Sequence, residues 1–169
     1  MSSLYLEWPG LTADNTLIID VDKSEFLSGA DTREYRGKVF KPKHETHITV
    51  FGSAVGAALR QKMTQDPAVE AEISKAFENT DWSYTRTEDF RHLVKTSTTT
   101  TAQSIIVLLE MDGMAAFHEK LKALNLIDQD HPLPPPHVTL YTCNCDTGIG
   151  VNSESELEAL TQDQVELPF

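Results

Sequence analysis

The chain has 169 residues, of which 40% are hydrophobic and 24% charged, a composition typical of a globular protein rather than of a fibrous or disordered chain. Its 14 basic and 26 acidic residues give a formal net charge of −12, which argues against broad binding of long RNA or DNA but leaves room for a small anion in a local pocket. We expect one domain over residues 1–169 and no membrane helix, because the longest strongly apolar run is 105–109 and a span needs roughly twenty residues.

The N-terminal half is expected to contain extended segments followed by two helices. The β-branched run 16–21 predicts a buried strand, and residues 38–51 predict a further extended stretch. After Gly52, apolar residues recur at helical spacing until Pro67 stops the helix. A second helix is predicted to begin there, with Asp66 as its N-cap and Pro67 in its first position.

The next segments are expected to mix strands with one helix. Residues 82–95 are interrupted by the polar residues 87–89, which predicts a hairpin or two successive strands. Residues 104–111 predict a buried strand, and the apolar spacing over 114–124 predicts a helix after it. A run of three prolines then leads into an extended segment that begins at His137.

Beyond Cys145 the chain becomes acidic and polar. Ser153 and Glu156 have the spacing of a capping box, which predicts a short helix. The residues after Leu160 offer little apolar surface to bury. We therefore expect residues 145–169 to form an acidic, weakly packed C-terminal tail.

Two segments of the chain repeat one pattern ninety positions apart. Residues 47–51 (His-Ile-Thr-Val-Phe) and 137–141 (His-Val-Thr-Leu-Tyr) both have the order histidine, aliphatic, threonine, aliphatic, aromatic. Because side chains alternate along a strand, each segment is expected to bury its two aliphatic residues. Its histidine, threonine and aromatic residue would then share the opposite face.

This repeated pattern suits the in-line cleavage of a phosphodiester. One group must take a proton from the attacking hydroxyl or water, and another must protonate the leaving oxygen on the far side of phosphorus. Histidine serves both roles because its ordinary pKa of about 6.5 leaves both forms accessible near neutral pH, and threonine hydroxyls can stabilise the charge on the non-bridging oxygens. We interpret His47, Thr49, His137 and Thr139 as candidate catalytic residues. The alternative is a pair of ordinary amphipathic strands in a cleft.

The chain resembles a known family, the two-histidine (2H) phosphoesterase superfamily, which includes RNA 2′-5′ ligase-like proteins and 2′,3′-cyclic nucleotide phosphodiesterases. The resemblance rests on residues 46–52 (Thr-His-Ile-Thr-Val-Phe-Gly) and 136–140 (Pro-His-Val-Thr-Leu), and covers roughly residues 15–142. It implies an α+β fold of two pseudo-symmetric lobes of antiparallel sheet backed by helices. The two His-x-Thr strands would lie in a central cleft and act without a metal. This chain differs in reaching its first motif early and in having a short acidic region after the second.

Three further residues are candidates for substrate binding. Lys43 lies four positions before His47 and, with Lys41, would share its face if the strand extends that far. Solvated lysines at a strand entrance are the alternative. Phe51 and Tyr141 are expected on the histidine face, where they would either flank a nucleobase or pack at the floor of the cleft.

The remaining histidines and cysteines are not expected to form a metal site. His44 and His47 are three positions apart and would point to opposite faces of a strand, while Cys143 and Cys145 follow the second motif. Surface or loop roles suffice for the histidines that lack a repeated context, which are His92, His118 and His131.

The sequence therefore predicts a metal-independent phosphodiesterase that needs no cofactor. Its substrate would be a nucleotide 2′,3′-cyclic phosphate, a 2′-5′ linkage or a cyclic oligonucleotide signal, and RNA ends are also compatible. A binding protein that sequesters a small phosphorylated ligand in the same cleft is the alternative, and end joining is disfavoured because no phosphate-cradling glycine loop is present. The N-terminus lacks the pattern of a secretory signal, so we expect a cytoplasmic protein with reduced cysteines and an oligomeric state that the sequence leaves open.

Overall fold

The computed structural model describes residues 2–26, 31–145 and 147–166, which adopt an α+β fold. Over these residues, eight strands belong to one antiparallel sheet. The strands are β1 (Leu17–Asp20), β2 (Arg33–Tyr35), β3 (Lys38–Pro42), β4 (His47–Phe51), β5 (Thr85–Thr96), β6 (Thr101–Glu110), β7 (His137–Cys143) and β8 (Thr161–Val165). The helices are α1 (Ser53–Gln65), α2 (Pro67–Glu78), α3 (Asp112–Ala123), α4 (Glu154–Leu160) and the short 3₁₀ helix η1 (Lys23–Glu25).

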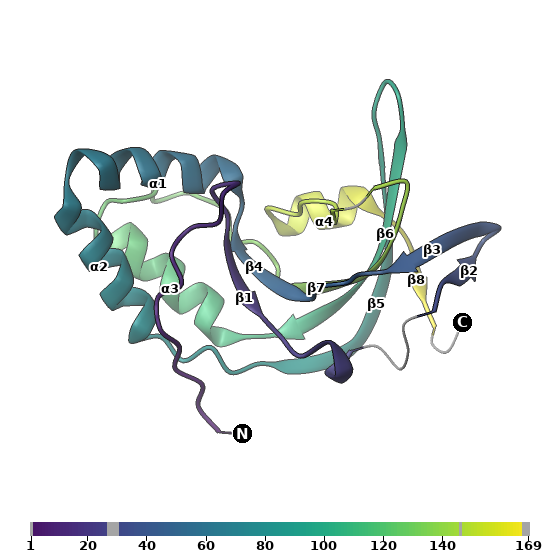
Figure 1. Cartoon of the computed structure of the whole chain (residues 1–169), viewed down its shortest axis with the longest axis horizontal. Coiled ribbons are helices and arrows are strands. Elements are labelled where there is room, and N and C mark those ends of the chain that lie inside the picture. Colours follow the sequence, from purple (N-terminus) through teal and green to yellow (C-terminus); the bar gives the residue numbers. More distant parts are fainter. Residues whose placement is uncertain (1, 27–30, 146, 167–169) are drawn as a thin grey trace.

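The strand order places segments from both ends of the sequence beside each other. Along the main path the order is β1-β4-β7-β6-β5-β8, and β3 joins β7 while carrying β2 as its hairpin partner. Figure 1 shows β4 and β7 in the middle of the sheet and the long β5–β6 hairpin projecting from it. The two segments with the repeated pattern are therefore neighbours in space.

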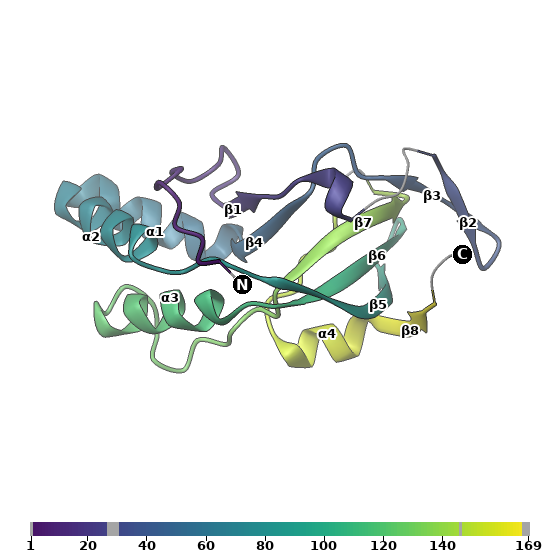
Figure 2. The same cartoon turned by 90° about the horizontal axis from the view of Figure 1, so that it is seen from below.

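The two faces of the sheet are covered by different helices. The main core buries the inner sides of α1, α2 and α3, represented by Leu59, Phe77 and Phe117, against strand residues such as Ile48 and Val138. These three helices gather at one end of the molecule in both views (Figures 1 and 2). A smaller cluster on the other face packs α4 against β5 and β6, and consists of Leu93, Ile106, Ile149, Val151 and Leu157.

The local signals for the helices in the N-terminal half are confirmed. α1 begins directly after Gly52, and α2 begins at Pro67 with the Asp66 carboxylate accepting a hydrogen bond from the backbone N–H of Ala68. Near the C-terminus, Ser153 Oγ accepts a hydrogen bond of 3.1 Å from the N–H of Glu156, as the capping-box spacing predicts. These contacts satisfy backbone donors that a helix start leaves free.

Two expectations about segments are wrong. Residues 82–95 do not form a hairpin, because Thr85–Thr96 is one long strand that accommodates its polar interruption as an irregularity between Arg86 and Phe90. The region from 147 to 166 is also not a weakly packed tail. It buries Ile149 and Val151, forms α4, and adds β8 to the edge of β5. Spaced single apolar residues anchor it, and they carry too little periodic signal to be recognised in the sequence.

Over the part of the chain that the structure describes, none of the helices combines the length and the apolar character needed to span a bilayer.

Candidate active site

The two His-x-Thr segments form neighbouring strands. β4 and β7 run antiparallel, with Ile48 paired to Val138, and neither residue has any exposed surface. Both belong to the main core. The side chains one position to either side of this pair therefore point to the opposite face of the sheet.

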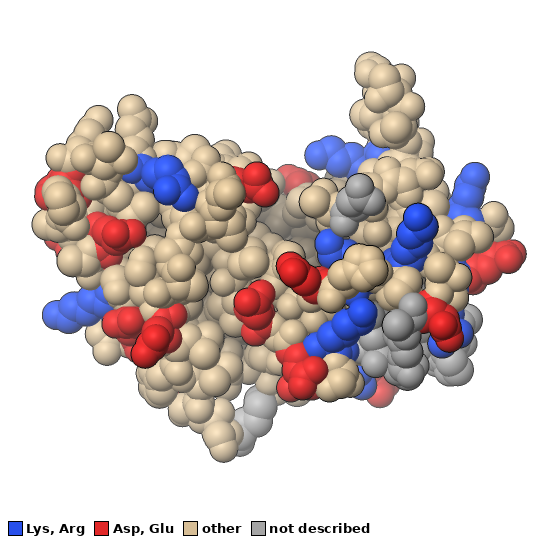
Figure 3. Space-filling model, in the orientation of Figure 1, with Lys and Arg blue, Asp and Glu red and all other residues tan. Residues whose placement is uncertain are grey.

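Counting one step outward from the Ile48–Val138 pair brings each histidine opposite the threonine of the other motif. His47 lies across from Thr139, and Thr49 across from His137, because antiparallel partners are numbered in opposite directions. Directly opposed residues on one face have Cβ atoms about 4.5–5.5 Å apart. Two imidazoles and two hydroxyls thus share a small area of the sheet. In Figure 3 the surface dips above this region, between the α1 side and the projecting hairpin.

Each of these strands carries one extra residue directly after its threonine. Val50 is skipped in the pairing of β4 with β1, and Leu140 is skipped in the pairing of β7 with β6. As a result, β1 pairs with β4 in the same register as β6 pairs with β7. Positions 17–20 of β1 therefore correspond to positions 105–108 of β6. The two halves of the site share the same bulge and the same register.

The bulges correct one prediction made from strand alternation. Phe51 and Tyr141 were expected on the histidine face, but they are 1% and 6% exposed and belong to the main core. An inserted residue changes the side to which the following side chain points, so the aromatic residue of each motif returns to the core. Their predicted role in flanking a nucleobase is therefore wrong.

His137 is the more deeply buried of the two histidines, at 9% exposed. Its Nδ1 donates a hydrogen bond of 2.9 Å to the carbonyl oxygen of Pro135. Because a carbonyl only accepts, this bond places the proton of the neutral ring on Nδ1 and leaves a lone pair on Nε2. Burial lowers the pKa of His137, the Pro135 bond opposes that effect, and the nearby charge of His47 lowers it further.

His47 is half-buried and surrounded by charged groups. Desolvation and the Lys43 ammonium lower its pKa, while Asp20 and Glu45 act to raise it. Among the described residues its buried Nδ1 has no hydrogen-bond partner. The ring is thus less constrained by hydrogen bonds than that of His137.

The segment after β7 covers part of this face. Gly148 lies so close to Thr139 that a Cβ atom added to it would come 2.8 Å from Thr139 Oγ1. Asn152 lies near the end of β4, since a Cβ on Gly52 would be 3.2 Å from its Oδ1. Residues 148–152 therefore form a wall that runs over Thr139, which the prediction of a loose tail had missed.

Of the predicted substrate-binding residues, Lys43 lies at the site. Its backbone N–H donates a 2.9 Å hydrogen bond to Leu140 O, which continues the pairing of β3 with β7. The positive charge of Lys43 acts to lower the pKa of His47 and that of the Cys145 thiol. An ammonium in this position adds positive charge beside the first histidine.

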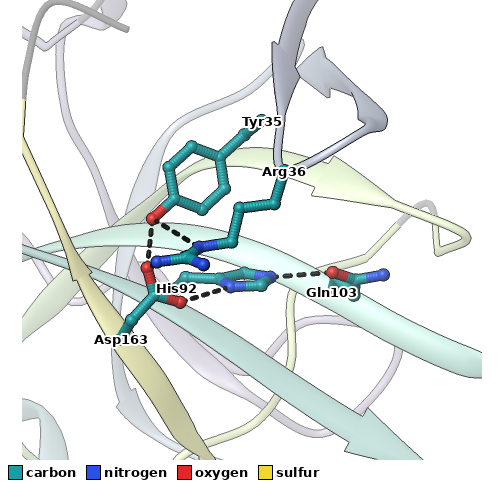
Figure 4. Close-up of polar contacts among 5 residues, drawn as sticks. All are labelled: Tyr35, Arg36, His92, Gln103 and Asp163. Atoms are coloured by element: carbon teal, nitrogen blue, oxygen red, sulfur yellow. Dashed lines mark hydrogen bonds and ion pairs between the residues drawn. The ribbon is translucent and has the colours of Figure 1, made fainter.

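A polar network around His92 was not predicted from the sequence (Figure 4). His92 is 4% exposed, its Nδ1 lies 2.9 Å from Asp163 Oδ1, and its Nε2 lies 2.7 Å from Gln103 Oε1. The Tyr35 hydroxyl and Arg36 Nε also donate to Asp163. Desolvation acts to raise the pKa of Asp163, but these hydrogen bonds outweigh it and the pKa is lowered.

The His92 network joins the β2–β3 hairpin to the strands β5, β6 and β8. Both ring nitrogens of His92 are engaged, and the residue opposite it on β6, Ile105, belongs to the main core. His118 is also buried, with Nδ1 donating to Met114 O at 2.8 Å. The expected surface or loop roles of these two histidines are therefore wrong, and His92 has a structural role on the side away from the His47–His137 pair.

A pocket of about 540 Å³ lies elsewhere, between α1 and the segment that follows α3. Its lining includes Val55, Lys62, Asn125, Asp128 and His131. None of the predicted site residues belongs to this lining. The pocket is therefore separate from the group formed by the two motifs.

Among the residues placed by the structure, no group of three or more histidine, cysteine or acidic side chains is arranged to hold a metal ion. Cys143 and Cys145 are free thiols. In comparisons with known proteins, no family model, curated protein or solved structure matches this chain.

Proposed function

We propose that the chain is a metal-independent phosphodiesterase of the two-histidine type. It would hydrolyse a nucleotide phosphodiester such as a 2′,3′-cyclic phosphate, a 2′-5′ linkage or a cyclic oligonucleotide. The observation that carries the proposal is the pairing of β4 with β7, which brings His47 opposite Thr139 and Thr49 opposite His137. In an ordinary pair of amphipathic strands, burial of the aliphatic residues does not require two imidazoles and two hydroxyls to lie together on the opposite face.

The matching halves of the site support the family assignment within this proposal. The bulges at Val50 and Leu140 and the shared register of β1 and β6 are what an approximate twofold relation between the two motifs would produce. Two pseudo-symmetric lobes that meet at a central cleft would produce this relation. Such a relation would set the two histidines on either side of one central point, where a phosphate would sit.

The proposed chemistry uses only side chains of this chain. One imidazole takes a proton from water or a sugar hydroxyl as its oxygen forms a bond to phosphorus, and the other donates a proton to the oxygen that leaves. Thr49 and Thr139 donate hydrogen bonds to the non-bridging oxygens. Lys43 adds positive charge beside the phosphate and would favour binding of the anion.

A screen with product identification tests this proposal. The purified chain is incubated in excess EDTA with 2′,3′-cyclic mononucleotides, 2′-5′ dinucleotides and cyclic di- and trinucleotides, beside His47→Ala and His137→Ala. We expect turnover of at least one class by the parent and loss of it in both variants. Activity that EDTA abolishes and a divalent ion restores would contradict the metal-independent reaction. Tight binding without turnover would favour the sequestering protein instead.

A further inference from the structure

The two halves of the site match in backbone pairing but differ in the residue that faces each histidine. On β1, Asp20 is the partner of His47, and in the same position on β6, Leu108 is the partner of His137. Opposed side chains on one face of an antiparallel pair lie about 4.5–5.5 Å apart at Cβ. One imidazole therefore has a carboxylate beside it, and the other has an aliphatic side chain.

The position of Asp20 is fixed by its neighbours. Thr46 is 4% exposed, and its Oγ1 donates a 3.0 Å hydrogen bond to Val21 O, while the N–H of Val21 donates to Thr46 O at 3.1 Å. These bonds tie the residue after Asp20 to the residue before His47. The Asp20 side chain is exposed, so placing its charge there carries no cost of burial.

The other charged groups near the two rings do not remove this asymmetry. Desolvation and the Lys43 ammonium lower the pKa of His47 overall, and the carboxylates of Asp20 and Glu45 offset part of this effect. For His137, the groups that act on its charge are the Pro135 carbonyl and His47. Leu108 is half-buried and packs against the smaller apolar cluster, so it offers no charge to stabilise an imidazolium.

We propose that Asp20 is a positioning residue that stabilises the protonated form of His47, so that His47 is the general acid and His137 the general base. This assignment rests on the proposed function. His137 Nε2, whose lone pair is directed by the Nδ1 bond to Pro135, accepts the proton of the attacking hydroxyl or water. A bond forms from that oxygen to phosphorus, the bond to the leaving oxygen breaks, and that oxygen takes the proton of His47. After the reaction His137 is protonated and His47 is neutral, and proton exchange with solvent returns both rings to their starting states.

The pH profile of kcat/KM separates this role from a merely structural one. The basic limb of the profile reports loss of the proton from the acid, and the acidic limb reports protonation of the base. In Asp20→Asn, removal of the carboxylate moves the basic limb to lower pH, with kcat/KM about threefold below the parent on that side and unchanged on the acidic side. The effect should shrink at high salt, since Asp20 is exposed.

The matched control is Asp14→Asn, which removes the same charge from an exposed position before β1. It should leave both limbs in place. NMR titration of the His47 and His137 rings gives a second readout that does not depend on activity. In Asp20→Asn, His47 should titrate at lower pH than in the parent, and His137 should keep its midpoint.

Three results would overturn the inference. These are a shift of the acidic limb in Asp20→Asn, an unchanged titration of His47, or the same shifts in Asp14→Asn. If the parent turns over none of the substrates, the proposed function and the acid role fail together. The NMR titration then still decides whether Asp20 sets the protonation of His47, so the two failures are distinguishable.

Discussion

The His47–His137 pair and the His92 network lie in one sheet but engage their imidazoles differently. Both ring nitrogens of His92 have partners, Asp163 and Gln103, and the ring joins a hairpin to the sheet. His137 uses one nitrogen for Pro135, and His47 has an Nδ1 without a partner among the described residues. A fully bonded imidazole holds structure, whereas one with an uncommitted nitrogen can exchange a proton. The comparison predicts that substitutions of His47 or His137 reduce turnover, whereas substitutions in the His92 network reduce stability.

The largest expected effect is on turnover. His47→Ala and His137→Ala should each lower kcat by at least about 10²-fold, because in the proposed reaction each removes a positioned general acid or base. The double variant should be far less impaired than the product of the single effects, since both groups serve one proton-transfer event. Steady-state kinetics measures this, and circular dichroism serves as the control for folding. Near-normal turnover in both single variants would remove the basis for the mechanism.

The corresponding substitution in the network should reduce stability instead. His92→Ala leaves Gln103 Oε1 without its partner and removes one of the groups bonded to Asp163, which should cost about 2–3 kcal/mol of unfolding free energy. For a chain of this size that corresponds to a Tm lower by roughly 5–10 °C. The kcat measured well below the Tm should change less than about twofold, given that His92 is on the other face of the sheet from the motifs. A drop in kcat comparable to that of His47→Ala would contradict the division between the regions.

The sequence revealed one of these regions and not the other, for a physical reason. The two histidine motifs repeat the same alternation of residue types, so periodicity alone places His47 and His137 on strands. The His92 network joins positions 35, 92, 103 and 163, which come together only when the sheet is assembled. No local pattern records such contacts.

Two details within the site itself could also not be predicted from the sequence. The bulges after Thr49 and Thr139 reverse the side on which Phe51 and Tyr141 lie, and no residue type marks them. The pairing of Asp20 with His47 depends on the register of β1 against β4. Elements with regular spacing, such as α1 and α2, were predicted because each apolar stripe is a local property.

The threonines should have an intermediate effect. Thr49→Ala and Thr139→Ala should each lower kcat about tenfold, the scale of losing one hydrogen bond to developing charge, with a smaller change in KM. Thr→Ser keeps the hydroxyl and serves as the control, with activity restored to near the parent. If Thr→Ser fails as badly as Thr→Ala, the methyl group matters through packing, and the hydroxyls are not the functional groups.

The smallest expected effect concerns the wall over Thr139. In Gly148→Ala the new Cβ would lie 2.8 Å from Thr139 Oγ1 and 3.3 Å from its Cβ and Cγ2, so the threonine must rotate or the segment must move. We expect kcat to fall about threefold, because a rotated hydroxyl loses part of its hydrogen bond in the transition state. Gly150→Ala is the matched control, since a Cβ there meets nothing within 4 Å, and it should behave like the parent. In a Thr139→Ala background Oγ1 and Cγ2 are gone and only the 3.3 Å contact with Cβ remains, so Gly148→Ala should add little further loss. A double-mutant cycle measured by kcat tests this coupling. If Gly148→Ala lowers kcat equally in both backgrounds, it acts through the wall in general and not through Thr139.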